Sequence, residues 1–527
     1  MTPVAMPRRG VSQTRTGAMQ IGINAMSGFG ARIAMMVIGF IVTPIVVNAL
    51  GLAQFGLVSI VGSIAGYLGL LDFGLGGAFV KFISEHVTRG ELHGARQVVT
   101  FGVLFYLLFG LVLAAPVYLV APFLVHLFHM PADQYAAAVR YFRIVYVLVI
   151  CSMAFSLAGS VVVGMHRMDI ASRNNFIGYL VSSGVTIAFL KVGYGVNAML
   201  CGMTAQLVVT ATLQYVSARR LLGSLWHDPR TFEWSMLRRL AGFGGWTQAN
   251  SLLNIFNLDV GRFIAASAIN IASLGVYEIG SKISFLTKSL PNYLLDALMP
   301  AASAADAAGD GLRLHAIYVR ATRYSTGLSL LFAGFIVGAA DEIVHVWIGR
   351  SLPFVAAILL WLTLGYAVNS TTGVGTTILR AKGLPRFETY YTAVASAVTV
   401  IATIVLLPRF GIVGVAAGSA CGWFGGSVYF FVVYHRYDRI PWWTSVGFPT
   451  VRLFAAAALA SAAVWRLVRV PAIAHLFDTR IIGMLALASV GVCYAAAFVA
   501  LSWLFGAWNE DVPIVIRRLR LAWGLST

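Results

Sequence analysis

The chain has little charge for its length. Only 11% of its 527 residues are Asp, Glu, Lys or Arg, whereas an ordinary soluble domain carries about 25%. Hydrophobic residues make up 59% of the chain, and the mean hydropathy is +0.83. Apolar runs long enough to cross a bilayer, about 20 residues each, recur along its whole length. This composition excludes a soluble globular protein and predicts a polytopic membrane protein.

Other features that are missing narrow the class further. The apolar runs are continuous and lack the alternation of a membrane β-barrel, so they predict an all-α bundle. The four cysteines form no CxxC pair, which indicates neither a zinc site nor a disulfide framework. No Walker A motif is present, so direct use of ATP is not expected, and we predict no cofactor and no metal. The longest loop, 219–242, is too short for a soluble catalytic domain, so we do not expect an enzyme.

Acidic residues are scarce relative to basic ones, which leaves a net charge of +18. The basic residues are spread over many short loops, a pattern typical of membrane topology and not of nucleic-acid binding. Of the 37 Lys and Arg residues, 24 fall in loops on the side of the N-terminus, six fall in the opposite loops, and seven lie inside or at the ends of spans. The positive-inside rule then predicts that both termini are cytoplasmic, with an uncleaved first span.

We count about fourteen spans from the apolar runs, each about 20 residues long. The predicted starts are near Ser27, Phe55, Val98, Ala136, Phe176, Asn197, Phe243, Ser273, Tyr324, Phe354, Thr389, Val413, Pro449 and Ile481.

An internal repeat relates the two halves of the chain. The segments 194–220 and 410–436 match at an offset of 216, with Gly195 over Gly411 and Gly202 over Gly418. Gly28-Phe29-Gly30 and Gly242-Phe243-Gly244 match at nearly the same offset. We therefore predict a duplication of six spans, with both copies in the same membrane orientation and a pseudo-two-fold axis along the membrane normal. The predicted domains are 1–225, 226–440 and, for two additional helices and a basic tail, 441–527.

The stretch LLDFGLGGAFVKFISEH, which begins at Leu70, places Asp72 at membrane depth at the end of span two. Its glycines do not complete a dinucleotide loop, because Phe79 occupies the last glycine position and a helix precedes it. Gly74, Gly76 and Gly77 are instead predicted to permit close helix packing or bending.

This stretch and the short basic loop after it resemble the polysaccharide-exporting flippases, the Wzx-type branch of the multidrug/oligosaccharidyl-lipid/polysaccharide (MOP) superfamily. The resemblance covers about residues 20–440 and includes Leu50-Gly51 and Gln54-Phe55-Gly56 before span two, and IASLGVYEIGSKI in span eight. Fourteen-span members include the lipid II flippases. The resemblance implies a V-shaped pair of bundles around a hydrated cavity whose arginines hold a diphosphate or acidic sugars.

Polar residues in span seven, GWTQANSLLNIFNLDVGRF, are candidates for lining this cavity. Asn250, Asn254 and Asn257 share one helix face and could bind sugar hydroxyls or join helices. Asp259 and Arg262 lie three residues apart and either neutralise each other or contact substrate.

Span eight carries a polar stripe of Glu278, Lys282, Ser289 and Asp296 at helical spacing. We interpret it as cavity lining, with packing between helices and a local Glu278–Lys282 pair as alternatives. Asp72, Asp259 and Asp296 are further candidates for coupling an ion or forming charge pairs, and Pro291 for a gating bend.

Arg32, early in span one, is interpreted either as reaching the cytoplasmic interface or as meeting the diphosphate of an arriving substrate.

Taken with the resemblance, these residues favour a flippase of polyprenyl-diphosphate-linked repeat units in a bacterial inner membrane, working by alternating access. The expected partners are this glycolipid, membrane lipids and polysaccharide polymerase or export machinery, with the protein itself a monomer. A drug or metabolite antiporter of the same superfamily and a membrane enzyme of glycan polymerisation or ligation are the alternatives.

Overall fold

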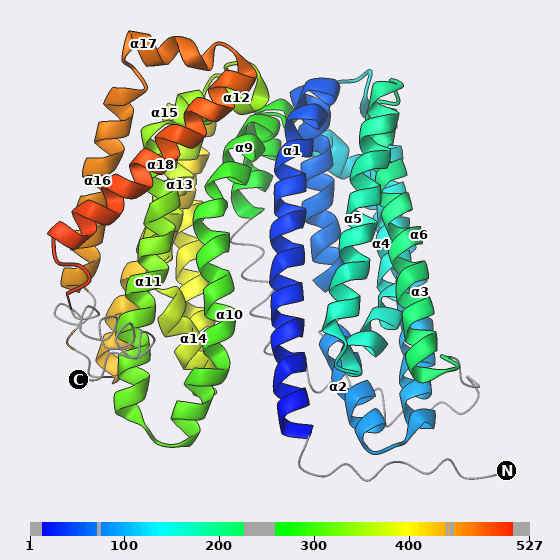
Figure 1. Ribbon diagram of the computed structural model, residues 1–527. Helices are drawn as coiled ribbons and strands as arrows, with labels where there is room; N and C mark the ends of the chain where they lie inside the picture. The colour runs from blue at the N-terminus through cyan, green and yellow to red at the C-terminus, as the bar shows by residue number, and fades with distance from the viewer. Residues whose placement is uncertain (1–12, 71–74, 226–258, 439–440, 442–446, 510–527) are drawn as a thin grey trace. The chain divides into compact units, whose positions relative to one another are not determined.

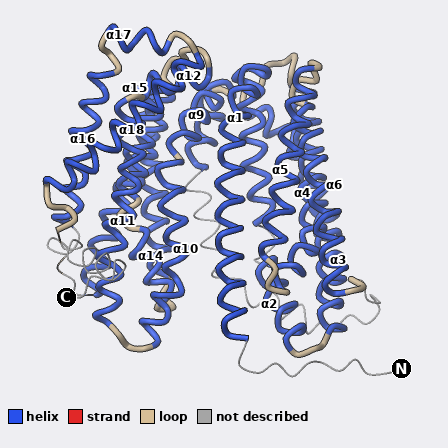
Figure 2. The backbone as a smooth tube through the Cα atoms, in the orientation of Figure 1, coloured by secondary structure: helices blue, strands red, loops and turns tan. Residues whose placement is uncertain are grey.

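A computed structural model describes residues 13–70, 75–225, 259–438, 441 and 447–509. All regular elements in these ranges are helices, as Figure 2 shows by colour. The internal contacts divide the chain into two compact units, Met1–Gln248 and Ala249–Thr527, and each unit is described by itself. The prediction of an all-α membrane protein is confirmed.

Several helices are long and apolar enough to cross a bilayer. Among the described residues seven pass by length and composition, or up to nine if two bent helix pairs each count as one span. Two of these helices are interrupted by a glycine with non-helical dihedrals, Gly51 in α1 (Gln13–Leu70) and Gly411 in α15 (Arg386–Asp438). The interruption at Gly51 falls between the predicted first and second spans. The total of fourteen stays a prediction.

Unit 1 is a helix bundle that begins with α1 (Figure 1). Its remaining helices are α2 (Leu75–Thr88), α3 (Leu92–Leu127), α4 (Tyr135–Gly164), α5 (Met168–Lys191) and α6 (Asn197–Leu222). In this bundle α5 packs against both α1 and α6, and α4 packs against both α3 and α6. Hydrogen bonds join the helix ends that carry basic residues: the side chain of Asn24 donates to the carbonyl of His166 at 2.9 Å, and Arg96 donates to the carbonyl of Leu222 at 3.3 Å.

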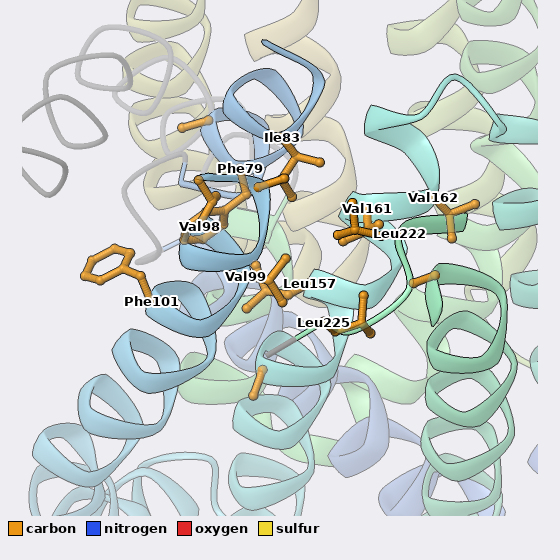
Figure 3. Packing of buried hydrophobic residues seen from close by; sticks show 14 of the residues in the cluster. Phe79, Ile83, Val98, Val99, Phe101, Leu157, Val161, Val162, Leu222 and Leu225 are labelled. Carbon is orange, nitrogen blue, oxygen red and sulfur yellow. The ribbon is translucent and has the colours of Figure 1, made fainter. Parts of the chain in front are cut away.

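The core of unit 1 lies near these joined ends. Phe79 and Ile83 of α2, Val98 of α3, Leu157 of α4 and Leu222 of α6 are buried in one cluster, part of which is shown in Figure 3. The cluster brings together the start of α3 and the ends of α4 and α6, so a short loop between antiparallel helices is enough to close each turn.

Unit 2 contains the second set of helices, coloured green to red in Figure 1. These are the π-helix η2 (Ala265–Ile269), α9 (Ile271–Ser284), α10 (Leu286–Ala307), α11 (Gly311–Gly338), α12 (Ala340–Ile348), α13 (Val355–Asn369), α14 (Gly373–Ala381), α15, α16 (Phe448–Leu467), α17 (Pro471–Ala474), the 3-10 helix η4 (His475–Phe477) and α18 (Arg480–Leu504). A second buried cluster joins the end of α10 and the start of α11 to α14 and both ends of α15.

The last two long helices of unit 2, α16 and α18, both pack against α11. The hydroxyl of Tyr494 in α18 donates to the carbonyl of Leu330 in α11 at 2.8 Å, and α16 lies against both α11 and α18. Gly334 leaves room for the Tyr494 hydroxyl, since a side chain at that position would overlap it. The division at 225 and 440 into three domains stays a prediction.

The glycines that match in the predicted repeat have the same local structure. Gly195 has φ +56° and Gly411 has φ +55°, a region that side chains rarely adopt. Gly202 and Gly418 each lie against the hydroxyl of a threonine on the preceding helical segment, Thr186 and Thr403 respectively. The nearly equal φ of the first pair and the similar threonine packing of the second pair support the duplication. The match between Gly28 and Gly242 cannot be compared, because 242–244 lie outside the described residues.

Candidate functional site

Unit 2 contains a buried ion pair between Asp259 and Arg262, which lie three residues apart in the sequence. Residues 259–264 are helical, and Asp259 and Arg262 stand three residues apart on this turn. The guanidinium of Arg262 donates a short hydrogen bond to the Asp259 carboxylate. The Asp259 side chain is only 6% exposed. The Asp259–Arg262 pair, one of the two alternatives that the sequence left open, is present in the structure.

A second carboxylate reaches the same arginine from the next helix. Arg262 Nε donates to Glu278 Oε2 of α9 at 2.8 Å, and the Glu278 side chain is 8% exposed. One guanidinium therefore bridges two carboxylates, which suits its planar set of donors. A buried carboxylate is tolerated at membrane depth only when it is paired in this way. The sequence offered Lys282 as the local partner of Glu278, but it did not predict the contact with Arg262.

Close backbone approach makes this bridge possible. A Cβ at Gly261 would lie 2.6 Å from the Tyr277 hydroxyl and 3.0 Å from the Ser419 hydroxyl. Tyr277 is buried in α9, and its hydroxyl lies 3.4 Å from that of Ser419 in α15. Glycine at position 261 thus lets three segments of unit 2 meet beside the ion pairs.

A lysine close in sequence to this cluster has aromatic partners. The Nζ of Lys288, in the first turn of α10, lies 3.7 Å from the ring centroid of Trp423 in α15 and 5.6 Å from that of Tyr366 in α13. The described part of the chain provides no carboxylate partner for Lys288. Aromatic faces attract a cation but leave its charge uncompensated.

Sequence reasoning did not select Lys288 as a site residue. No acidic residue stands three or four positions from it, and both aromatic partners come from distant helices. The one available signal was a lysine at membrane depth, which is costly and therefore usually functional.

The polar stripe predicted for span eight crosses a helix break. α9 ends at Ser284 and α10 begins at Leu286, so the stripe is not one continuous helix face. Glu278 is buried in the ion-pair cluster, the Lys282 side chain is exposed, and the buried Ser289 hydroxyl has no hydrogen-bond partner among the described residues. For Asp296 only the helical backbone is described.

The helix continues through the predicted bend at Pro291. Proline lacks the N–H that would bond the Thr287 carbonyl, and the hydroxyl of Ser329 in α11 donates to that carbonyl at 3.0 Å. The helix break lies earlier, at Phe285. The gating role of Pro291 stays a prediction.

The remaining predicted site residues lie elsewhere. Arg32 is on α1 in unit 1 with an exposed side chain, and Gly76 and Gly77 are in the first turn of α2. Asp72, Gly74, Asn250, Asn254 and Asn257 fall outside the described residues. The structure therefore brings together Asp259, Arg262 and Glu278, and their binding roles stay predictions.

The charges of unit 2 suit an anionic ligand. Asp259 and Glu278 are both paired with Arg262, whereas Lys288 lies against aromatic rings and has no carboxylate partner among the described residues. An anion entering beside Lys288 would gain a charge-assisted hydrogen bond in a low-dielectric environment, where such bonds are strongest. The cluster contains no arrangement of nucleophile and base that would indicate a reaction.

The chain is similar to two membrane proteins in sequence. It is 22% identical over 353 residues to the uncharacterized membrane protein EpsK of Bacillus subtilis, covering 67% of this chain and 70% of that protein. It is 21% identical over 414 residues to the probable flippase AglR of Haloferax volcanii, covering 76% and 80%.

Solved structures share its fold. The lipid II flippase MurJ in an inward closed conformation matches with a TM-score of 0.66 at 12% identity, covering 93% of this chain and 99% of that one. An inward-facing multidrug resistance MATE transporter of the MOP superfamily matches with a TM-score of 0.63 at 15% identity, covering 79% and 98%. The predicted MOP fold is confirmed.

A family model described as "Polysaccharide biosynthesis protein" matches residues 21–305, which is more than half of the chain. The match includes α1 from residue 21 onward, α2 to α6, the ion-pair cluster and Lys288. The long apolar helices, the membrane-embedded charges and this match agree with one another. The protein is a multi-pass membrane protein and belongs to the polysaccharide biosynthesis protein family.

Proposed function

We propose that the protein moves polyprenyl-diphosphate-linked oligosaccharide repeat units, with undecaprenyl as the lipid, from the inner to the outer leaflet for cell-surface polysaccharide synthesis. The observation that carries this proposal is Lys288, a cation inside a membrane-spanning bundle with aromatic rings and no described carboxylate around it. A diphosphate supplies the missing counter-charge, and sugar rings pack on the same aromatic faces.

The proposed cycle is alternating access. The anionic headgroup enters from the cytoplasmic side, Arg32 and Lys288 attract it, and the lipid tail stays in the bilayer. Asp259 and Glu278 pair with Arg262 and hold its guanidinium in place, so Lys288 is the basic residue of unit 2 that meets the headgroup in this proposal. With the cytoplasm negative, outward movement of an anion is favoured by about 2.3 kcal/mol per charge per 100 mV. The protein therefore works without chemistry of its own.

We place the protein in the bacterial inner membrane with both termini in the cytoplasm. The 24 basic residues in loops on the N-terminal side support this orientation. Three working parts, 1–225, 226–440 and 441–527, follow from the predicted duplication. The polymerase or export machinery of the polysaccharide is the expected partner, and no nucleic acid is involved.

The test is translocation in proteoliposomes. The full chain is reconstituted with a polyprenyl-diphosphate-linked oligosaccharide, and arrival of the glycan in the opposite leaflet is followed by its accessibility to a lectin or glycosidase. A cationic drug is tested in parallel vesicles. Glycolipid movement above that of empty vesicles supports the proposal. Drug exchange without glycolipid movement would instead indicate an antiporter of the MATE type.

A matched pair of variants connects the assay to the site. Lys288→Met removes the charge and keeps an unbranched apolar chain against Trp423, whereas Lys191→Met removes an exposed charge from the end of α5 in unit 1. The loss of one charge-assisted hydrogen bond costs about 1.5–3 kcal/mol, so we expect glycolipid movement to fall about tenfold or more in Lys288→Met. Equal rates in both variants would contradict the role of Lys288.

A further inference from the structure

Unit 1 contains a pocket that the proposed function does not use. Its volume is about 770 Å³, and it lies between the second half of α3 and the first half of α4. Ala114, Val117 and Val139 form apolar parts of its wall, and Arg140 and Arg143 are the charged residues that line it. The pocket thus combines an apolar wall with two basic residues that stand three positions apart on one helix. This combination is typical of a site for an anionic amphiphile.

Arg143 bonds to a backbone carbonyl of the neighbouring helix that a proline leaves without its helix hydrogen bond. Pro122 lacks the N–H that would bond the Tyr118 carbonyl, and an Nη of Arg143 donates to this carbonyl at 3.1 Å. The guanidinium carbon also lies 3.4 Å from the centroid of the Tyr118 ring. Two contacts with one residue therefore fix the position of the guanidinium before any ligand binds.

These contacts leave hydrogen-bond capacity on the arginines. The Nε of Arg143 is buried and has no partner among the described residues. Neither Arg140 nor Arg143 has a carboxylate partner in the described part of the chain, and the Arg140 side chain is exposed. Unused guanidinium donors beside an apolar wall are costly, which favours an external acceptor.

The position along α4 corresponds to the depth of lipid headgroups. α4 has 30 residues, so it is about 45 Å long at 1.5 Å per residue, longer than the roughly 30 Å hydrocarbon core. Both arginines lie within its first three turns. Tyr118 and Val147, which also line the pocket, are 57% and 56% exposed, so the pocket opens onto apolar surface of the bundle.

We propose that this pocket binds an anionic phospholipid of the surrounding leaflet, with its phosphate between Arg140 and Arg143 and part of an acyl chain against Ala114 and Val117. Guanidinium groups match the geometry of a phosphate. The apolar walls and the opening toward exposed aliphatic and aromatic side chains favour a lipid over a soluble anion. The ligand stabilises the junction of α3 and α4, where Pro122 interrupts the helix hydrogen bonds.

The test is lipid binding to the purified full chain in detergent, measured by native mass spectrometry. Phosphatidylglycerol is the probe, phosphatidylcholine tests the need for net negative charge, and excess inorganic phosphate tests the need for a lipid. We expect bound phosphatidylglycerol in the wild type and an affinity about tenfold lower in Arg143→Gln, since one charge-assisted hydrogen bond to the phosphate is lost. Lys191→Gln, which removes an exposed cation at the end of α5, should bind as the wild type does.

Two further variants keep the test decisive if Arg143→Gln does not fold. Arg140→Gln changes an exposed side chain and should weaken phosphatidylglycerol binding. Ala114→Phe fills the pocket with both arginines in place and should do the same. Binding that is unchanged in both variants, equal binding of phosphatidylcholine, or full displacement by inorganic phosphate would overturn the proposal. Because this experiment measures lipid binding, its result tests the phospholipid site independently of glycolipid translocation.

Discussion

The ammonium nitrogen of Lys288 lies 3.7 Å from the ring centroid of Trp423, although the two residues belong to different helices, α10 and α15. A second ring, that of Tyr366 in α13, lies 5.6 Å from the same nitrogen. Aromatic faces stabilise a desolvated cation by about 2 kcal/mol, much less than a paired carboxylate and its hydrogen bonds would. The arrangement therefore positions the lysine by its aromatic contacts and leaves its counter-charge to be supplied by a ligand.

We predict that the aromatic face of Trp423, and not only its volume, supports transport through Lys288. We expect Trp423→Leu to slow glycolipid translocation, since the cation loses its best aromatic face, and Trp423→Phe to have a smaller effect because one face remains. Initial rates in proteoliposomes measure the difference. Equal rates for the two variants would show that the ring acts only by filling space.

Arg262 is expected to be needed for stability as well as transport. Arg262→Gln leaves Asp259 and Glu278 as neighbouring buried carboxylates, and breaking a buried pair costs about 3–5 kcal/mol. Thermal unfolding in detergent should show a large decrease in midpoint. The double variant Arg262→Gln with Glu278→Gln removes one of the two uncompensated charges and should recover part of the loss. A midpoint for the double variant below that of the single one would count against the ion-pair account.

Gly261 is predicted to be the tightest position of the cluster. In Gly261→Ala the new Cβ would lie 2.6 Å from the Tyr277 hydroxyl, and overpacking of this kind typically costs about 1–3 kcal/mol. Tyr277→Phe in the same chain removes the clashing oxygen and should restore stability in part. Gly184→Ala, where the added methyl meets open space in α5, is the matched control and should unfold near the wild-type temperature.

The turn between the predicted eleventh and twelfth spans depends on Gly411. Its dihedrals, φ 55° and ψ −133°, fall where a side chain is strained, so Gly411→Ala should cost about 1–3 kcal/mol. By the duplication we expect a similar cost for Gly195→Ala. Unfolding midpoints of the two variants provide the comparison, and a large effect at one position with none at the other would weaken the duplication.

Much of the architecture follows from local sequence. The low charge and the long apolar runs place the chain in a membrane. Because lipid offers no hydrogen bonds, the backbone groups must bond within helices, which selects an all-α bundle. The spacing of Asp259 and Arg262 was enough to predict their pair, because residues three apart on a helix are neighbours whatever surrounds them. Glycines 195 and 411 were matched from sequence, and their φ angles agree.

Contacts between helices were decided only by the tertiary structure. Glu278 joins Arg262 from the following helix, so a pattern within one helix pointed instead to Lys282. Lys288 finds Trp423 and Tyr366, and Arg143 finds Tyr118, across helix packings that no periodicity in the sequence encodes. The sequence by itself determines which segments enter the membrane, because burial in lipid depends on local composition. Which charges are compensated there depends on side chains that only the packing of distant helices brings within hydrogen-bond reach.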